Sequence, residues 1–502
     1  MSARCVMVLG TTSGAGKSWL TTALCRYYQR QGLRVAPFKA QNMSNNARVV
    51  ASPQGQGEIG SAQYFQALAA GAQPDVRMNP LLLKPEHDRH SQVVLLGQVN
   101  PELTQMPWRT RSAAVWPTIA RTLDALRADY DVVVIEGAGS PAEINLSDSD
   151  IVNMRVARHG QAACLLVTDI DRGGAFAHLY GTWALLPPEE QALIKGFVLN
   201  KFRGDAGLLE PGPALLQQRT GIATVATLPM WWQHGLPEED GVFDARSVGH
   251  GRIHTTVAVI AYPRISNLDE FQPLKNIPGL RLVWARHADD ISHLQASDWI
   301  ILPGSKQTSG DLDWLRRQGL DQHVARHAER GGAVLGICGG LQMLGEALID
   351  PHGIDGNAPG LGLLPLVTLF ASEKTVRQTQ RQFSAALAPA DTPWPATPWR
   401  KLAGVSVQGY EIHHGQTQQH AAMAAAGNLA RAVLPQDLAW CNPAGNVLGV
   451  YLHGLFEDAG VLQALFGAPG AAQVPTLETV FDGLADFIEA HFSAGVLQQL
   501  LR

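Results

Sequence analysis

The sequence predicts an α/β protein in which a doubly wound parallel sheet domain, at the N-terminal end, is joined to a second α/β domain. Strands alternate with helices over residues 1 to about 230, which is typical of doubly wound sheets. A short apolar strand, residues 5–9, leads into the glycine-rich loop 10–18 and a helix over residues 19–31. A second α/β series begins at residue 256 and contains another strand, residues 333–337, that turns directly into a helix over residues 341–347.

Length and composition are those of an ordinary globular protein. The 502 residues, 46% hydrophobic and 17% charged, allow several domains with their own cores. A net charge of -5 gives no reason to expect nucleic acid or an anionic membrane as a partner. We expect a cytoplasmic protein, because the N-terminus has no signal pattern and no apolar run approaches membrane-spanning length. Widely spaced cysteines without a Cys-x-x-Cys pair favour free thiols over disulfides or zinc: Cys5, Cys25, Cys164, Cys338 and Cys441.

The division into domains follows changes in composition. Residues 1–230 form the first α/β domain, and residues 231–251 are predicted to be a linker because Trp231, Trp232, Pro237 and several acids interrupt the pattern. Residues 252–465 form the second α/β domain. Residues 466–502 are predicted to be a C-terminal helical segment.

The loop Gly10-Thr11-Thr12-Ser13-Gly14-Ala15-Gly16-Lys17-Ser18 predicts a nucleotide site. Its backbone N–H groups are suited to hold phosphates, Lys17 to reach the β and γ oxygens and Ser18 to bind Mg²⁺. Five residues separate Gly10 from Gly16, one more than in the usual pattern. A chance glycine-rich loop is the alternative, but the order of strand, loop, Lys-Ser and helix favours ATP binding by Thr12, Gly14, Gly16, Lys17 and Ser18.

Polar residues after the second strand are candidates for ligand binding. Gln41, Asn42 and Asn45 are predicted to line a substrate pocket, although a simple polar turn is an equally good interpretation. Glu58 precedes an Ala/Gln-rich helix and is a candidate outer Mg²⁺ ligand, with a helix cap as the alternative.

Two later strands end in polar residues at the edge where open α/β sheets bind ligands. The β-branched run 132–135 ends at Glu136, which is predicted to hold Mg²⁺ or its water opposite Ser18. The strand 196–199 ends at Asn200, which is predicted to contact the base of ATP.

Cys338 is the predicted nucleophile. It lies between Gly336 and the pair Gly339-Gly340, where a tight strand-to-helix turn would expose its side chain and the helix dipole would favour the thiolate. A small apolar cysteine is the alternative for an isolated residue. The N–H of Gly339 and the loop containing Gly304 and Ser305 are predicted to hold an oxyanion.

His453 is the predicted partner of Cys338. The apolar strand 447–452 delivers it at the carboxyl end of the second sheet. A thiolate needs a base that later protonates a leaving amine, and imidazole does this near neutral pH. A structural role is the alternative for a histidine at a strand end.

These motifs resemble two known families. The pattern Gly336-x-Cys338-x-Gly340-x-Gln342 with a distant histidine resembles the class I glutamine amidotransferases, which implies that Gln342 belongs to the glutamine site. The phosphate-loop spacing and Glu136-Gly137-Ala138-Gly139 resemble the dethiobiotin-synthetase group of P-loop proteins. Both modules in this order resemble the cobyrinate-amidating enzymes of cobalamin synthesis.

Three stretches favour the cobyric acid synthase branch over the cobyrinic acid a,c-diamide synthases, which remain the alternative: 37–45, 78–85 and 409–413. The resemblance implies ATP, Mg²⁺ and L-glutamine-dependent amidation of the b, d, e and g carboxylates of a corrinoid, adenosylcobyrinic acid a,c-diamide. A nucleotide-switched regulator with an inactive amidotransferase domain is a further alternative, disfavoured by the presence of Cys338 and His453.

The third member of the triad and the oligomeric state stay open at this point. Class I amidotransferases carry a His-Pro-Glu triplet, whereas His453 is followed by Gly454-Leu455-Phe456-Glu457. The triplet therefore does not identify a carboxylate that orients His453.

Overall fold

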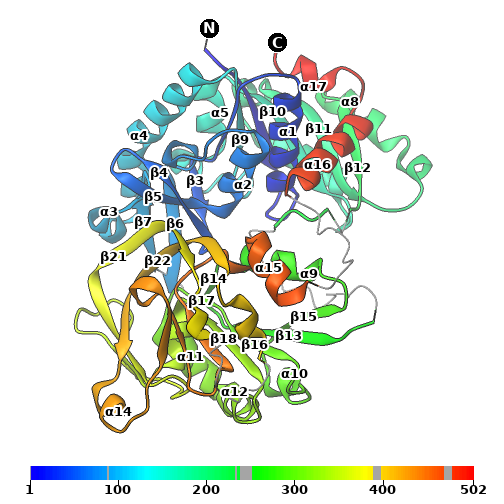
Figure 1. The fold of residues 1–502 in the computed structure, drawn as a ribbon. Coiled ribbons are helices and arrows are strands. Elements are labelled where there is room, and N and C mark those ends of the chain that lie inside the picture. Colours follow the sequence, from blue (N-terminus) through cyan, green and yellow to red (C-terminus); the bar gives the residue numbers. More distant parts are fainter. Residues whose placement is uncertain (1, 88–89, 232–233, 238–251, 388–396, 468–476) are drawn as a thin grey trace.

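The computed structural model describes residues 2–87, 90–231, 234–237, 252–387, 397–467 and 477–502. Two α/β units lie one above the other, as Figure 1 shows. Within the described residues, six strands form the parallel sheet of the first unit. Their order across the sheet is β12 (Thr224–Pro229), β11 (Ile194–Phe202), β10 (Ala163–Asp169), β1 (Arg4–Gly10), β9 (Val132–Glu136) and β2 (Val35–Phe38).

The second unit is built on a mixed sheet that is parallel except at one edge. Strands β24 and β23 pair antiparallel there, and the others are parallel. The order is β15 (Leu280–Ala285), β13 (Thr255–Ile260), β16 (Trp299–Leu302), β18 (Ala333–Ile337), β25 (Val447–Val450), β24 (Ala439–Cys441) and β23 (Arg431–Leu434). The prediction of two tandem α/β domains is confirmed.

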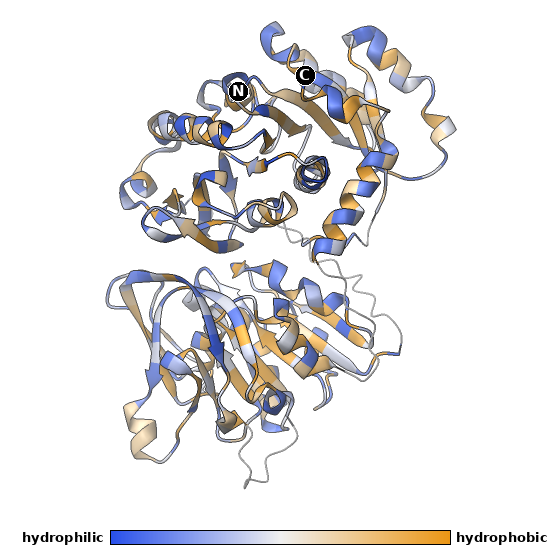
Figure 2. Ribbon diagram, turned by 45° about the horizontal axis from the view of Figure 1, so that its top comes forward, coloured by the Kyte–Doolittle hydropathy of each residue, from blue (hydrophilic) through white to orange (hydrophobic). Residues whose placement is uncertain are grey.

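Helices cover the sheets, and apolar residues concentrate in the strands between them, as Figure 2 shows. The predicted linker 231–251 lies largely outside the described residues. The helices of the first unit are α1 (Lys17–Arg30), α2 (Ser61–Ala69), α3 (Pro101–Gln105), α4 (Trp108–Asp129), α5 (Met154–Gly160), α6 (Ala175–Ala184), α7 (Pro188–Gln191) and α8 (Gly212–Thr220). Those of the second are α9 (Gln272–Lys275), α10 (Ala288–Ile291), α11 (Thr308–Arg317), α12 (Leu320–Glu329), α13 (Gly339–Leu344), α14 (Ala421–Ala425) and α15 (Ala459–Phe466).

The C-terminal helices return to the first unit. Helices α16 (Leu477–His491) and α17 (Val496–Gln499) lie beside α1, at the top of Figure 1. Arg26 Nε donates to Asp482 Oδ1 at 2.8 Å, and the hydroxyl of Tyr28 donates to the carbonyl of Leu497 at 2.8 Å. Phe481 is buried in the same apolar cluster as the inner face of α1. The end of the chain is therefore packed on its beginning.

Small sheets lie where the two units face each other. A long hairpin of β21 (Leu366–Gln382) and β22 (Ser406–Gln419) extends from the second unit towards β4 (Ala47–Ser52) and β5 (Gly55–Gly60) of the first (Figure 1). The side chain of Gln378 donates to the carbonyl of Val49 at 3.0 Å. The remaining short strands are β3 (Gln41–Met43), β6 (Leu81–His87), β7 (His90–Leu95), β8 (Gln98–Val99), β14 (Ile265–Ser266), β17 (Gly304–Ser305), β19 (Ala347–Ile349) and β20 (Ala358–Pro359).

Some local expectations differ from the structure. The helix after Cys338 begins at Gly339 rather than at residue 341, because two glycines let the chain coil at once. Glu58 lies inside strand β5 and not at a helix start. None of the helices in the described parts of the chain is long and apolar enough to span a membrane.

Candidate active sites

Cys338 lies at a strained turn between β18 and α13. Its φ of 52° and ψ of -106° are unusual for a residue with a side chain. The neighbouring glycines allow the close approach: a Cβ on Gly340 would lie 1.8 Å from the carbonyl oxygen of Leu302, and one on Gly336 would lie 2.6 Å from Gly340. The packing of α13 against β16 and β18 therefore requires glycine on both sides and leaves the Cys338 thiol at the apex.

His453 and Glu270 complete a triad with Cys338. The Cys338 and His453 side chains line the same pocket, where the thiol donates to the carbonyl of Ile412 at 3.5 Å. His453 Nδ1 lies 3.2 Å from Glu270 Oε1, and the N–H of Gly454 donates to Glu270 Oε2 at 3.1 Å. All three side chains are buried. The order nucleophile, imidazole and carboxylate is that of catalytic triads in acyl-transfer enzymes.

The electrostatics of the triad favour the protonated form of His453. Burial opposes protonation of His453, but the charge of Glu270 and the hydrogen bond with Cys338 outweigh it and raise the pKa of His453 to about 10. At neutral pH, the imidazolium is therefore the favoured form of His453. In this form the ring carries a proton that it can give to a group leaving from the Cys338 site.

Sequence reasoning left the carboxylate of the triad open, and the structure places Glu270 there. It lies in the short helix η4 (Leu268–Phe271), far before Cys338 in the chain. The only local signal is a pair of adjacent acids, Asp269 and Glu270, directly before an apolar residue. Acidic residues are usually exposed, but both of these side chains are buried.

The predicted oxyanion residues lie next to the Cys338 turn and the His453 ring. A Cβ on Gly339 would lie 2.8 Å from the backbone nitrogen of Ser305, and one on Gly304 would lie 2.8 Å from His453 Cε1. The backbones of β17 and the turn thus approach each other beside the triad. Ser305 is held by Asp311, to which its hydroxyl donates at 2.6 Å. Burial raises the pKa of Asp311 to about 7, although this hydrogen bond acts in the other direction.

Gln342 forms part of the wall beside Cys338. Its Oε1 accepts from the hydroxyl of Thr308 at 3.1 Å, and its Nε2 donates to the hydroxyl of Tyr451 at 3.4 Å. A Cβ on Gly415 would collide with this amide, 2.3 Å from Nε2. The side chain is therefore fixed in the pocket wall rather than pointing freely into it.

The pocket that contains Cys338 and His453 is shared by the two units. The second unit supplies Cys338, His453, Ser305, Lys306, Gln342, Lys374, His413 and His414 among others. The first unit supplies Asn45, Lys84, Glu86 and Gln92. The thiol therefore faces the first unit across a polar pocket.

The glycine-rich loop forms the second site. Gly14 and Gly16 adopt φ values of 70° and 101°, in the left-handed region. Lys17 Nζ donates to the carbonyls of Thr12 and Gly139, each at 3.1 Å, and so spans the mouth of the loop. The amide of Asn200 donates to the carbonyl of Ala15 at 2.9 Å. This arrangement is suited to hold the phosphates of a nucleotide beside the carboxyl ends of β1 and β9.

Glu136 is buried beside the loop. Its carboxylate accepts hydrogen bonds from Ser18 Oγ at 2.7 Å, Lys39 Nζ at 2.9 Å and Gln66 Nε2 at 2.6 Å. Burial opposes ionisation, but Lys39 with the other donors holds the pKa of Glu136 below its ordinary value. A carboxylate whose ionised form is favoured, next to a phosphate-loop hydroxyl, fits Mg²⁺, which takes one or two protein oxygens and completes its shell with phosphate and water.

The other predicted ligand residues lie in different places. Asn42 lines the phosphate-loop pocket and donates to Gln63 at 3.1 Å, whereas Asn45 lines the Cys338 pocket. Gln41 is half-buried in β3. The structure does not bring Glu58 together with Ser18 and Glu136. Its carboxylate is bound instead by Lys84 at 2.6 Å and by Lys374 of the facing hairpin.

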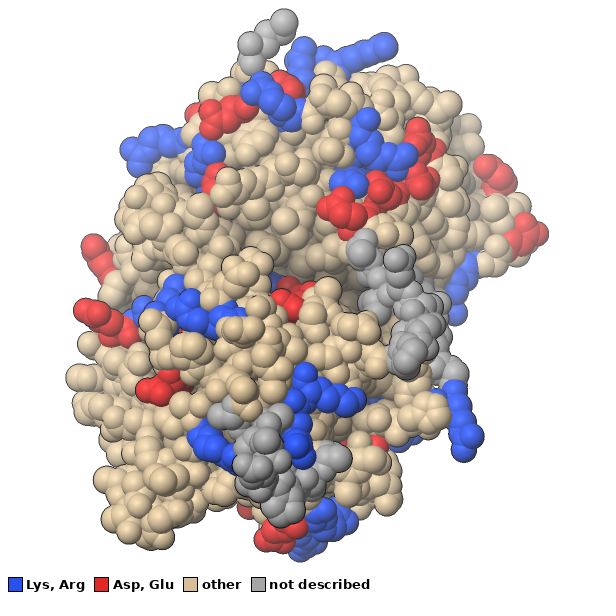
Figure 3. Space-filling view, in the orientation of Figure 1, with Lys and Arg blue, Asp and Glu red and all other residues tan. Residues whose placement is uncertain are grey.

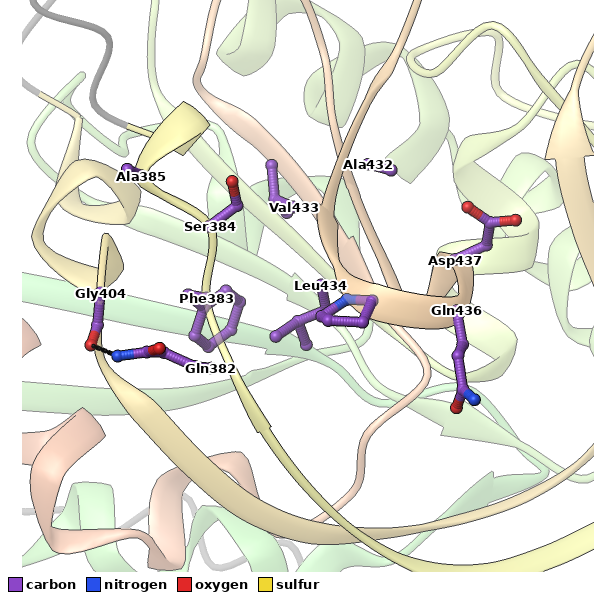
Figure 4. Close-up of a pocket in the computed structure, with 11 residues that line it drawn as sticks. Gln382, Phe383, Ser384, Ala385, Gly404, Ala432, Val433, Leu434, Gln436 and Asp437 are labelled. Atoms are coloured by element: carbon purple, nitrogen blue, oxygen red, sulfur yellow. Dashed lines mark hydrogen bonds between the residues drawn. The ribbon is translucent and has the colours of Figure 1, made fainter.

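Surface charge and a third hollow are features of the molecule away from these two sites. On the face shown in Figure 3, positive and negative side chains are interspersed. Figure 4 shows a separate hollow near β23, where the Gln382 amide donates to the carbonyl of Gly404 at 2.8 Å. Asp437 is the one charged residue among those that line this hollow. This hollow shares no lining residue with the two pockets described above.

Comparisons with known proteins agree with this arrangement. Residues 6–233 match the CobQ/CobB/MinD/ParA nucleotide binding domain, and residues 256–461 match the CobB/CobQ-like glutamine amidotransferase domain. A cobyric acid synthase of Albidiferax ferrireducens is 74% identical, with 100% of both chains covered. Those of Polaromonas naphthalenivorans and Acidovorax ebreus are 71% and 70% identical, with 100% of this chain and 100% and 99% of theirs covered. The chain belongs to the cobyric acid synthase family.

Proposed function

We propose that this protein uses ATP and L-glutamine to convert the b, d, e and g carboxylates of adenosylcobyrinic acid a,c-diamide into amides, giving adenosylcobyric acid. One observation carries the proposal: the pocket of the Cys338–His453–Glu270 triad is lined in part by the unit that holds the phosphate loop. One chain thus contains a centre suited to release ammonia, whose pocket is lined in part by the first unit, and a centre in that unit suited to activate an acid.

At the first centre, Cys338 Sγ attacks the side-chain amide carbon of glutamine. The backbone N–H groups of Ser305 and Gly339, whose backbones approach each other closely, would stabilise the oxyanion. His453 gives its proton to the departing nitrogen, so ammonia leaves and a thioester remains. Water, deprotonated by His453, then hydrolyses the thioester to glutamate and restores the thiol. Glu270 orients the imidazole throughout.

At the second centre, the γ-phosphoryl group of ATP passes to a corrinoid carboxylate. The products are ADP and an acyl phosphate, from which ammonia displaces phosphate to form the amide. Lys17, which lines the phosphate-loop pocket, would stabilise the transferred phosphoryl oxygens. When bound, Mg²⁺ held by Ser18 and Glu136 would neutralise charge on the phosphates.

Ammonia must travel between these centres in its neutral form, because ammonium has no lone pair with which to attack. Asn45 Oδ1 and His414 Nε2 are buried without a hydrogen-bond partner among the described residues, and both residues line the Cys338 pocket. His414 Nδ1 donates to the carbonyl of Ala371 at 3.1 Å, so Nε2 is left as an acceptor. Burial lowers the pKa of His414 to about 4, which keeps the ring neutral. These two acceptors are suited to the N–H groups of passing ammonia.

Replacing these acceptors should separate hydrolysis from amidation. In Asn45→Leu and His414→Phe, we expect the amide formed per glutamate released to fall several-fold, because ammonia loses its hydrogen-bonding partners and escapes. Parallel assays of glutamate and corrinoid amide measure this ratio. An unchanged ratio in both variants would exclude these atoms from the route.

The role of Glu270 is tested by Glu270→Gln. Glutamine hydrolysis should fall by about 10³-fold or more, since the amide neither holds the imidazole in the correct tautomer nor stabilises its charge. Amidation supported by ammonium salts should continue, because Glu270 belongs to the second unit, whereas the phosphate loop belongs to the first. Glu329→Gln is the matched control, because Glu329 is exposed at the end of α12 in the same unit and its substitution should leave hydrolysis unchanged.

The substrate assignment is tested by mass spectrometry of the corrinoid. Incubation with ATP, Mg²⁺ and glutamine should convert adenosylcobyrinic acid a,c-diamide into a product with amides at b, d, e and g. If cobyrinic acid were amidated at a and c while the diamide stayed unchanged, the substrate assignment would be wrong.

A further inference from the structure

The turn that carries Glu270 is held by the other unit of the protein. The side-chain amide of Asn267 donates to the carbonyl of Ala47 at 2.9 Å. The N–H of Leu268 donates to Asn46 Oδ1 at 3.0 Å. Asn267, at the start of the turn, has a φ of 56°, in the left-handed region that few residues with a side chain adopt. The two contacts with the first unit help to hold this conformation. Asn46 directly precedes strand β4 of the first unit, and Ala47 is its first residue.

Arg48, the next residue of β4, binds this turn and also a second segment near His453. Its guanidinium donates to the carboxylate of Asp269, the residue directly before Glu270. It also forms a bidentate pair with Glu457, with Nη1 to Oε2 at 2.8 Å and Nη2 to Oε1 at 2.6 Å. Glu457 belongs to η8 (Leu455–Glu457), which follows His453 and Gly454. One guanidinium therefore ties the segment with the carboxylate to the segment with the imidazole.

Packing holds the guanidinium in this position. The Arg48 side chain is 3% exposed, and its guanidinium carbon lies 5.0 Å from the ring centre of Phe65 and 5.2 Å from that of Tyr410. Tyr410 stacks on His453, with ring centres 5.4 Å apart and planes 22° apart. Phe65 lies on α2 and lines the phosphate-loop pocket. Arg48 is thus enclosed between one residue of each site.

We infer that Arg48 is a positioning residue through which the nucleotide-binding unit completes the glutaminase triad. It does not contact the reacting atoms. It fixes the relative placement of Glu270 and His453, so glutamine hydrolysis depends on the docking of the two units. The inference rests on the proposed function, and it adds that the amidotransferase unit alone lacks part of its own active-site support.

The test compares Arg48→Gln and Arg48→Lys in the full chain. In Arg48→Gln, kcat for glutamine hydrolysis should fall by about tenfold or more, because small misplacements of catalytic groups are costly, while KM for glutamine changes little. Arg48→Lys keeps the charge without the bidentate geometry and should recover part of kcat. Amidation supported by ammonium salts should stay within about twofold of the unsubstituted protein.

Two further variants keep the test decisive. Asp269→Asn removes the charge partner and leaves Arg48 in place, so it should reproduce the loss of kcat even if Arg48→Gln folds poorly. Arg77→Gln is the matched control, since Arg77 pairs with Asp75 and Asp129 inside the first unit and should leave both activities unchanged. Unchanged kcat in both Arg48→Gln and Asp269→Asn, or equal loss of glutamine hydrolysis and ammonium-supported amidation, would overturn the inference. Absence of corrinoid amidation in the unsubstituted protein would instead refute the proposed function and leave the glutaminase comparison valid.

Discussion

Cys338→Ala should lose glutamine-dependent amidation by about 10⁴-fold or more, because no other group at the turn can form the thioester. The thiol lies at the apex of a turn whose neighbouring glycines leave no room for other side chains. His453 lies beside it, and Glu270 contacts the His453 ring. With ammonium salts at raised pH, where free ammonia is plentiful, the same variant should amidate the corrinoid at a rate close to that of the unsubstituted protein. Product formation with either nitrogen source measures both effects.

The matched control is Cys441→Ala. Cys441 is buried in β24 of the same sheet, and its substitution should leave hydrolysis nearly unchanged. If Cys338→Ala also lost amidation with ammonium salts, the two chemical steps would not be divided between the sites as proposed.

Lys17→Met should lose amidation with both nitrogen sources, by about 10³-fold, because the charge that stabilises the transferred phosphoryl group is removed. Methionine preserves most of the volume of this buried side chain, so the loss can be assigned to charge. Glutamine hydrolysis should persist, since Cys338, His453 and Glu270 are untouched. Glutamate release and corrinoid amide formation are measured side by side.

Lys195→Met serves as the control for Lys17→Met, because Lys195 is an exposed lysine of the same sheet. Full amidation by Lys17→Met would contradict the assignment of phosphoryl transfer to the glycine-rich loop. The assignment would also be contradicted if Lys17→Met lost glutamine hydrolysis but kept amidation with ammonium salts.

Local patterns were sufficient to predict the fold, and they also suggested the residues that we propose for the centre of each site. The strand-to-helix turns around Lys17 and Cys338 have short-range signals, because glycine spacing and apolar runs determine them directly. The structure brings Cys338 and His453 together as predicted, since both lie at the carboxyl edge of adjacent parallel strands, β18 and β25.

Contacts between distant segments were beyond local patterns. Glu270 reaches His453 only through the docking of η4, and the sequence around it gives no catalytic spacing. Glu58 reads as a metal ligand from its chain neighbours, yet the pairing of β4 with β5 directs it towards Lys84 and Lys374. The polar run that includes Asn42 and Asn45 divides between two pockets, because the short strand β3 ends between them.

The central claim is that nitrogen passes from Cys338 to the phosphate loop inside the protein. The most direct measurement supplies glutamine labelled with ¹⁵N in its side-chain amide, together with excess unlabelled ammonium, and determines the isotope in the corrinoid amides by mass spectrometry. Internal transfer predicts amides that carry mainly ¹⁵N in the unsubstituted protein and only unlabelled nitrogen in Cys338→Ala. Amides whose isotope ratio matches that of the bulk ammonia would contradict it.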